Sequence, residues 1–164
     1  MPFISLDFLQ DADPEDHYEF FSQNNYPKCN YHTVSEFNSY FNKNHLSLVN
    51  CNIRSFNRNF DTLNSVFHGN NLPSIFCLTE TKFSSSTVQK ISGYDPFHTP
   101  RDSDTAAGGI SLYIKKNLRA TKIDALSYCN DTIEISTAEF NFGKQHAIVI
   151  GVYRPHSDTI ENFN

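Results

Sequence analysis

Residues 46–82 read LSLVNCNIRSFNRNFDTLNSVFHGNNLPSIFCLTETK and hold two apolar runs on either side of a helical pattern. The first run, Leu46–Ile53, is mostly apolar and predicts a buried strand. The second run, Ser74–Thr79, is almost continuous in apolar residues, which is typical of a strand covered on both faces. Two neighbouring strands joined by one helix crossover indicate an α/β layer structure.

The segment between the two strands predicts one amphipathic helix. Phe60, Leu63 and Phe67 recur at helical spacing and would form one apolar face. Asn57 or Asn59 is the expected cap at the start of this helix.

The rest of the chain predicts three further strands and a long loop. Gly109–Ile114 alternates with period two, and Asp131–Phe140 and His146–Tyr153 flank a predicted hairpin turn at Asn141–Lys144. Residues 91–105 contain glycine and two prolines and are expected to form a loop. The fold class is therefore α/β (α+β), with about one mixed sheet and one or two helices.

Charge and apolar content divide the chain into two parts. Its 164 residues are enough for one domain, but the hydrophobic fraction of 38% is low. Residues 1–45 hold seven acids against two lysines and account for the whole net charge of −5, so we expect an acidic leader that is partly disordered. Residues 46–164 are neutral, and no basic stripe supports nucleic-acid binding on charge alone.

The cysteines and the lengths of the apolar runs indicate in which cellular compartment the protein is expected. None of the four cysteines forms a C-x-x-C pair, and Cys51 and Cys77 lie inside apolar runs, so reduced, buried thiols in an intracellular protein are favoured over disulfides. Apolar runs stay shorter than the roughly 20 residues that a membrane span needs, so no membrane is expected as a partner.

Two polar residues close the first two predicted strands. Asn52 ends the first strand and Glu80 ends the second, and the helix crossover would bring both to the same edge of the sheet. Because burying an unpaired carboxylate costs several kcal/mol, Glu80 must be exposed, paired or metal-bound. An amide and a carboxylate together suit Mg²⁺, although a solvated strand end remains the alternative.

Several segments, in order, resemble the endonuclease/exonuclease/phosphatase superfamily, whose members have a DNase I-like or AP endonuclease-like fold. The Tyr-Arg-Pro form of the last segment, and the leader Tyr31–Asn38, are most similar to the endonucleases of non-LTR retrotransposons. The segments that carry the resemblance are Asn52–Ser55, Leu78–Lys82, Ile91–Tyr94 followed by Arg101 and Gly108–Ile114, and Val149–Pro155.

The resemblance implies the N-terminal half of a four-layer α/β sandwich and a Mg²⁺- or Mn²⁺-dependent DNA endonuclease that nicks a target site for retrotransposition. It implies that Glu80 and Asn52 form the metal site and that Tyr153 lies near the scissile phosphate. The expected partners are the target DNA duplex and the reverse transcriptase domain of the same element, in the nucleus. Substrate-binding roles are expected for Arg54, Arg101 and Arg154.

The family's second half carries an Asp-x-Asn pair and a terminal Ser-Asp-His, and these 164 residues contain neither in the expected place. His156-Ser157-Asp158 comes too early to be the second motif. Without a general base and a phosphate-holding histidine, we expect residues 46–164 to be a truncated domain that is inactive alone.

Other interpretations remain open at this point. The chain could be a phosphoinositide phosphatase or sphingomyelinase of the same superfamily, or a non-catalytic binding fragment. Tyr153 could pack beside Phe140, Arg101 could belong to a solvated loop, and Gly108-Gly109 could serve a turn rather than a phosphate.

Overall fold

The structure is a computed structural model that describes residues 4–7, 41, 45–67, 72–83, 89–101 and 108–155. Its elements follow the predicted order of strand, helix and strand through β2 (Leu48–Asn52), α3 (Phe56–Phe67) and β3 (Ile75–Thr79). Most of the predicted acidic leader lies outside the described residues. Within the described part, no helix is long and apolar enough to cross a bilayer.

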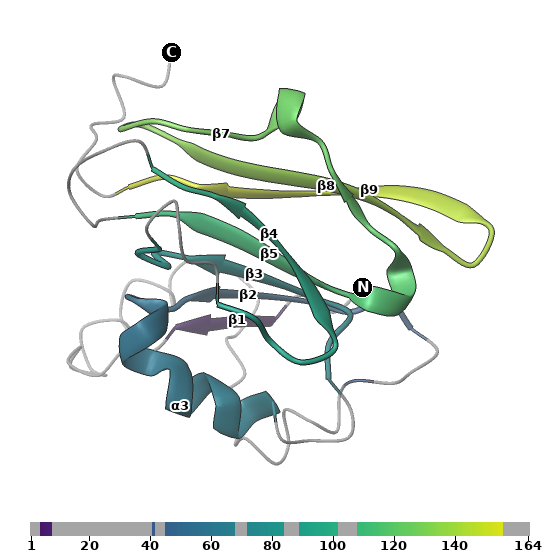
Figure 1. The fold of residues 1–164 in the computed structure, drawn as a ribbon, viewed down its shortest axis with the longest axis horizontal. Coiled ribbons are helices and arrows are strands. Elements are labelled where there is room, and N and C mark those ends of the chain that lie inside the picture. Colours follow the sequence, from purple (N-terminus) through teal and green to yellow (C-terminus); the bar gives the residue numbers. More distant parts are fainter. Residues whose placement is uncertain are drawn as a thin grey trace, which may run out of the picture.

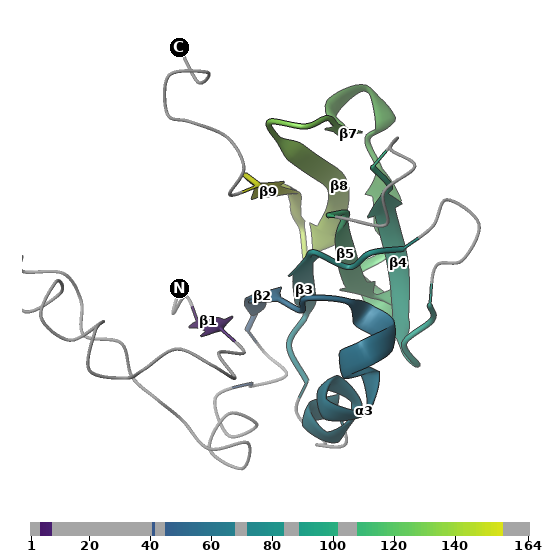
Figure 2. The ribbon, with the colours of Figure 1, turned by 90° about the vertical axis from the view of Figure 1, so that its left-hand side faces the viewer.

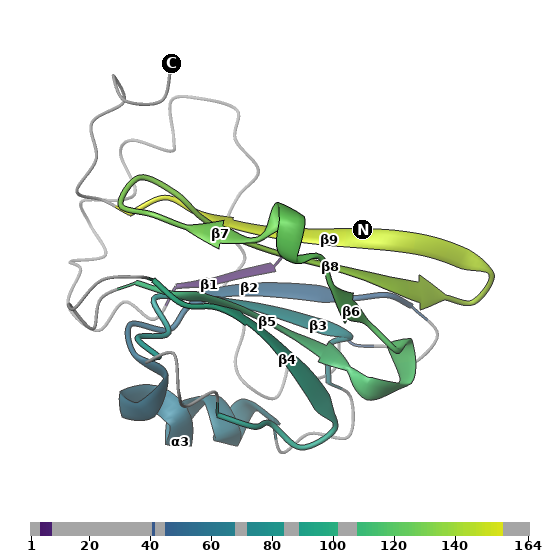
Figure 3. The same cartoon turned by 45° about the horizontal axis from the view of Figure 1, so that its top comes forward.

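The first sheet has five strands in the order β1-β2-β3-β5-β4 (Figure 1). β1 (Ile4–Asp7), β2 and β3 run parallel, whereas β5 (Ile110–Lys115) and β4 (Tyr94–Thr99) pair antiparallel. β1 was not among the predicted strands; it lies at the edge of the sheet, beside β2 (Figure 3).

The expected loop at 91–105 was wrong for residues 94–99, which form β4. Proline argues against a central strand because it lacks an N–H to donate. Among the described strands β4 lies at the edge and pairs with β5, and Pro96 sits opposite Tyr113 in that pair. An edge position leaves one side of the strand without a ladder, which makes the proline acceptable there.

A second, antiparallel sheet is built around the hairpin of β8 (Glu134–Phe142) and β9 (Gln145–Tyr153). The predicted turn is confirmed, with Gly143 at φ +62°. The sequence did not separate this hairpin from the first sheet. The remaining short elements are η1 (Lys116–Leu118), β6 (Thr121–Lys122), η2 (Asp124–Leu126) and β7 (Tyr128–Cys129).

The layers are helix, first sheet and second sheet (Figure 2). Phe76 and Leu78 of β3 pack with α3, whereas Ile75 and Cys77 of the same strand pack with the second sheet. This arrangement explains why all five residues of β3 are buried. It confirms the prediction of a strand covered on both faces.

Helix α3 begins at Phe56, whose ring is fully buried, two or four residues before the start that a cap at Asn57 or Asn59 implies. The capping prediction was wrong because Asn57 and Asn59 lie inside the helix. Ser55 precedes it at φ +100°, and the Asn59 side chain reaches back to donate to the Ile53 carbonyl at 2.7 Å. The asparagine therefore ties the helix to the end of β2.

Cys51 and Cys77 are buried, as predicted, and neither forms a disulfide within the described residues. Burial raises the pKa of the Cys77 thiol to about 12. Cys77 is thus protonated at neutral pH and behaves as a small apolar residue between the sheets.

Candidate active site

The ends of β2 and β3 meet at one edge of the first sheet. The two strands are parallel, and Asn52 lies opposite Thr79, so Glu80 is the first residue beyond that pair. The Asn52 Nδ2 donates a hydrogen bond of 2.8 Å to Glu80 Oε1. The predicted meeting of these two side chains is confirmed, and their catalytic and metal-binding roles stay predictions.

The loops that follow the two strands hold each other through backbone hydrogen bonds. The N–H groups of Ser55 and Phe56 donate to the carbonyls of Glu80 and Thr81 at 2.8 and 2.9 Å. Arg54 and Glu80 both have positive φ, at +47° and +53°. Side chains other than glycine adopt this conformation at a cost, and such strain gathers at functional sites.

The second sheet adds a third group to the site. Tyr153, the last residue of β9, donates its hydroxyl to Glu80 Oε1 at 2.5 Å. Its ring also packs against the cluster that contains Phe140, so the alternative packing role describes the ring but not the hydroxyl. Burial, and then the contact with Glu80, raise the pKa of Tyr153, which keeps the phenol protonated as a donor.

The Glu80 carboxylate is held in its ionised form. Burial alone would raise its pKa, but the hydrogen bonds from Tyr153 and Asn52 and the charges of Lys82 and Arg54 outweigh burial. The pKa of Glu80 therefore lies below its ordinary value. An acidic group that stays ionised at neutral pH is the form that a divalent cation needs.

The donor set fits a divalent cation that keeps most of its waters. The hydrogen bonds from Asn52 and Tyr153 both reach Glu80 Oε1, which directs them away from Oε2. Asn52 Oδ1 accepts the Arg54 N–H at 3.1 Å and has a second lone pair. No group of three or more His, Cys, Asp or Glu side chains arranged for a metal is found among the described residues. Mg²⁺ is commonly held by one or two carboxylates together with water and phosphate.

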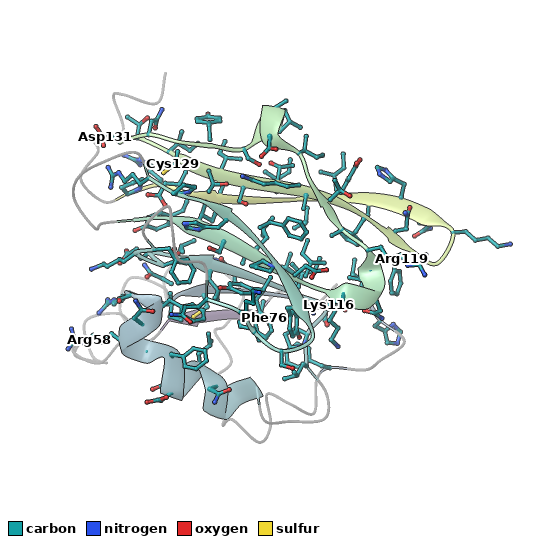
Figure 4. The ribbon with its side chains drawn as sticks, in the orientation of Figure 1. Arg58, Phe76, Lys116, Arg119, Cys129 and Asp131 are labelled. Carbon is teal, nitrogen blue, oxygen red and sulfur yellow. The ribbon has the colours of Figure 1, made fainter. Side chains whose placement is uncertain are left out.

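The three predicted substrate-binding arginines lie in different settings. Arg54 contributes positive charge at Glu80. The Arg101 side chain is mostly buried, and its guanidinium donates at 2.7 Å to Asp131, which Figure 4 labels, so the Arg101 side chain itself is not solvated. Arg154 follows Tyr153 directly and is half-buried, so its place at the site rests on that adjacency.

Gly108 and Gly109 form a backbone segment, which we call the glycine turn, beside the loop after β3. Gly108 and Gly109 have φ of +76° and +90°. Their carbonyls accept the N–H groups of Lys82 and Thr81 at 2.8 and 3.0 Å. The turn therefore supports the loop that carries Glu80.

One acid at this end of the molecule was not predicted. Glu134, at the start of β8, is fully buried and faces the first sheet. An acid between Ile133 and Ile135 in a strand-like run was a signal, because period-two alternation places it on the face opposite its two neighbours.

No protein-family model matches the chain, and no curated protein matches its sequence. Among solved structures, the chain is similar to the AP endonuclease LMAP from Leishmania major, with a TM-score of 0.58 and 16% identity over 84% of this chain and 48% of that chain. The catalytic domain of APE2 from Xenopus laevis matches with a TM-score of 0.46 and 18% identity, over 69% of this chain and 46% of that one.

The chain thus spans about half the length of the structures it matches. At this level of identity the likeness concerns the fold. The chain has the predicted α/β fold, a partial DNase I-like sandwich of the kind seen in an AP endonuclease.

Proposed function

We propose that this chain supplies the metal-binding part of a Mg²⁺-dependent DNA endonuclease domain. The observation that carries the proposal is the ionised Glu80 carboxylate at the edge of the first sheet, held on one oxygen by Asn52 and Tyr153. The likeness in fold to an AP endonuclease supports DNA as the substrate.

The residues of this chain divide the work of such a site. Asn52 and Tyr153 orient the carboxylate by donating to the same oxygen, while Arg54 and Lys82 place positive charge beside it for a phosphate. A bound Mg²⁺ or Mn²⁺ would supply charge stabilisation on the leaving oxygen of a phosphodiester. Glu80 would be its carboxylate ligand.

The retrotransposon type is the finer part of the proposal. It rests on the segment Tyr153-Arg154-Pro155 and on the leader Tyr31–Asn38. On this proposal the domain acts in the nucleus beside a reverse transcriptase domain of the same element. Residues 46–164 hold neither the family's general base nor its phosphate-holding histidine in the expected place, so on this proposal they do not cleave DNA alone.

Cation binding tests the metal site directly. We expect Mn²⁺, titrated into the purified chain and followed by electron paramagnetic resonance, to occupy one specific site. Glu80→Gln should weaken this binding by about tenfold or more, because it removes the charge that the cation meets. The matched control is Glu139→Gln, an exposed acid of β8 paired with His146. Equal Mn²⁺ binding by the Glu80→Gln variant and the wild type would contradict the proposal.

Nicking of a supercoiled plasmid tests the activity. With Mg²⁺ present, we expect the chain alone to leave the plasmid intact. Nicking that Glu80→Ala abolishes would support the endonuclease and would overturn the inactivity of the isolated chain.

A further inference from the structure

Glu134 is a buried acid that the proposed chemistry does not use. It is the first residue of β8, is fully buried, and faces the first sheet. The strand register places it directly between Cys129 of β7 and Tyr153 of β9. Charged side chains are rarely buried, because moving an ionised carboxylate out of water without a partner costs much free energy.

The carboxylate lies against the glycine turn. A Cβ at Gly108 would collide with Glu134 Oε1, so a side chain at that position would exclude the acid. Burial raises the pKa of Glu134, and the Gly109 N–H, the Arg101 charge and the Cys129 thiol offset this only in part. Those contacts are loose, because neither carboxylate oxygen has a hydrogen bond of good geometry among the described residues.

The glycine turn connects this acid to the loop after β3. The Thr81 N–H donates to the Gly109 carbonyl at 3.0 Å, and the Lys82 N–H donates to the Gly108 carbonyl at 2.8 Å. Glu80 and Lys82 both adopt a φ of +53°. Backbone in this region persists only where its surroundings hold it, and the glycine turn is one of those surroundings.

A second connection runs through Tyr153. Glu134 and Tyr153 are directly opposite each other on β8 and β9 and share a face. The Tyr153 hydroxyl donates to Glu80.

We propose that Glu134 is a positioning residue for Glu80, because it lies against the Gly108–Gly109 turn, which holds the loop after Glu80, and opposite Tyr153, whose hydroxyl donates to Glu80. The importance of this role for cation binding rests on the proposed function. The position of Glu134 against the glycine turn and opposite Tyr153 does not depend on that function.

Hydrogen exchange measured by NMR on the full chain tests the positioning. In Glu134→Gln, we expect exchange of the Thr81 and Lys82 amides to speed up about tenfold, while the amides of β3 keep their wild-type rates. Glu134→Asp, which keeps the carboxyl group but withdraws it by one methylene, should give the same local change. Glu139→Gln, an exposed site on the same strand, is the control and should match the wild type.

Two results would overturn the proposal. One is wild-type exchange at Thr81 and Lys82 in both Glu134 variants. The other is a uniform increase across all amides, which would make Glu134 merely structural.

Mn²⁺ titration separates this proposal from the proposed function. We expect Glu134→Gln to weaken Mn²⁺ binding about tenfold, the typical effect of losing a group that orients a metal ligand. If Glu80→Gln leaves Mn²⁺ binding unchanged while Glu134→Gln alters the Thr81 and Lys82 amides, the cation proposal fails and the positioning role stands. If Glu80→Gln weakens Mn²⁺ binding and Glu134→Gln changes neither binding nor exchange, the cation proposal stands and the positioning role fails.

Discussion

The Tyr153 hydroxyl donates a 2.5 Å hydrogen bond to Glu80 Oε1 across the junction of the two sheets. Tyr153 ends β9 in the second sheet, and Glu80 follows β3 in the first. The geometry of the candidate site therefore depends on how the second sheet packs on the first, as well as on the pairing of β2 with β3.

Replacing Tyr153 with phenylalanine should weaken the site without unfolding the chain. The ring would still pack in the cluster that contains Phe140, but the hydroxyl that donates to Glu80 would be lost. Because that hydrogen bond lowers the Glu80 pKa, we expect the pKa to rise in the variant, as measured by carboxyl carbon NMR during an acid titration. Mn²⁺ affinity should fall about tenfold.

A matched control for this change is Tyr128→Phe, which removes a hydroxyl from an exposed tyrosine of β7. It should leave both the Glu80 titration and Mn²⁺ binding unchanged. An unaltered Glu80 titration in Tyr153→Phe would show that the hydroxyl does not stabilise the ionised carboxylate.

Glu80 and Glu134 should affect stability in opposite directions as pH changes. The pKa of Glu80 is lowered in the folded chain, so its contribution is present above the ordinary glutamate pKa and is lost as pH falls through the lowered value. The pKa of Glu134 is raised, chiefly by burial, so its contribution is present at low pH and is lost as pH rises through the raised value.

Thermal melts of both glutamine variants across acid and neutral pH measure this contrast. The Tm deficit of Glu80→Gln relative to the wild type should shrink as the solution becomes more acidic. Glu134→Gln should gain Tm relative to the wild type as pH rises toward neutrality. Parallel pH curves for the wild type and both variants would rule out the two linkages.

Much of the first sheet could be predicted because its signals are local. Apolar runs and helical spacing within residues 46–79 specify β2, α3 and β3. The meeting of Asn52 and Glu80 then follows from the helix crossover between neighbouring strands. β4 was missed because Pro96 is acceptable only at a sheet edge, and which strand lies at an edge depends on distant pairing.

The second sheet was harder to predict because its faces contradict a simple apolar pattern. Ile148, Ile150 and Val152 are exposed by 52%, 56% and 55%, whereas Glu134 and Gly151 face the first sheet. The hydrophobic pattern alone predicts that these branched apolar residues face the core. At Gly151 the two sheets approach so closely that a side chain would meet Cys77, and this requirement appears only once both sheets are in place.

The burial of His98 predicts that the free energy of unfolding falls in mild acid. Burial, together with the charge of Lys122, lowers the His98 pKa to about 4 from 6.5, and the Ile110 carbonyl opposes this only in part. The contribution of the neutral ring is thus present above pH 6.5 and is lost as pH falls toward about 4. Denaturant unfolding at several pH values should show a smaller acid loss in His98→Asn, whose amide can replace Nδ1 opposite Ser111.

The control for this prediction is His146→Asn, which alters an exposed histidine on β9. Its unfolding free energy should follow the wild-type trend with pH. An equal acid loss in His98→Asn and the wild type would assign the trend to other groups.

Gly151 tests how closely the second sheet approaches the first. A Cβ at this position would lie 2.7 Å from Cys77 Sγ and 3.0 Å from Ile110 Cδ1. In an open strand, alanine in place of glycine would stabilise the chain by restricting its unfolded state. Here we expect Gly151→Ala to reduce the free energy of unfolding by about 1 to 3 kcal/mol, because overpacking outweighs that gain.

A double variant identifies the cause of this loss. Cys77→Ala removes the sulfur that the new Cβ would meet, so Cys77→Ala with Gly151→Ala should be more stable than the sum of the single effects by at least about 0.5 kcal/mol. Gly143→Ala is the control: among the described residues, no atom beyond its chain neighbours lies within 4 Å of its Cβ, and its φ of +62° alone should cost about 1 kcal/mol. Because Gly143 has no steric partner, its loss should add to that of Cys77→Ala. Additive effects for the Cys77 and Gly151 pair as well would mean that the sheets can separate to admit a methyl group. The contact between Tyr153 and Glu80, two residues beyond Gly151, would then be less tightly fixed than the close packing implies.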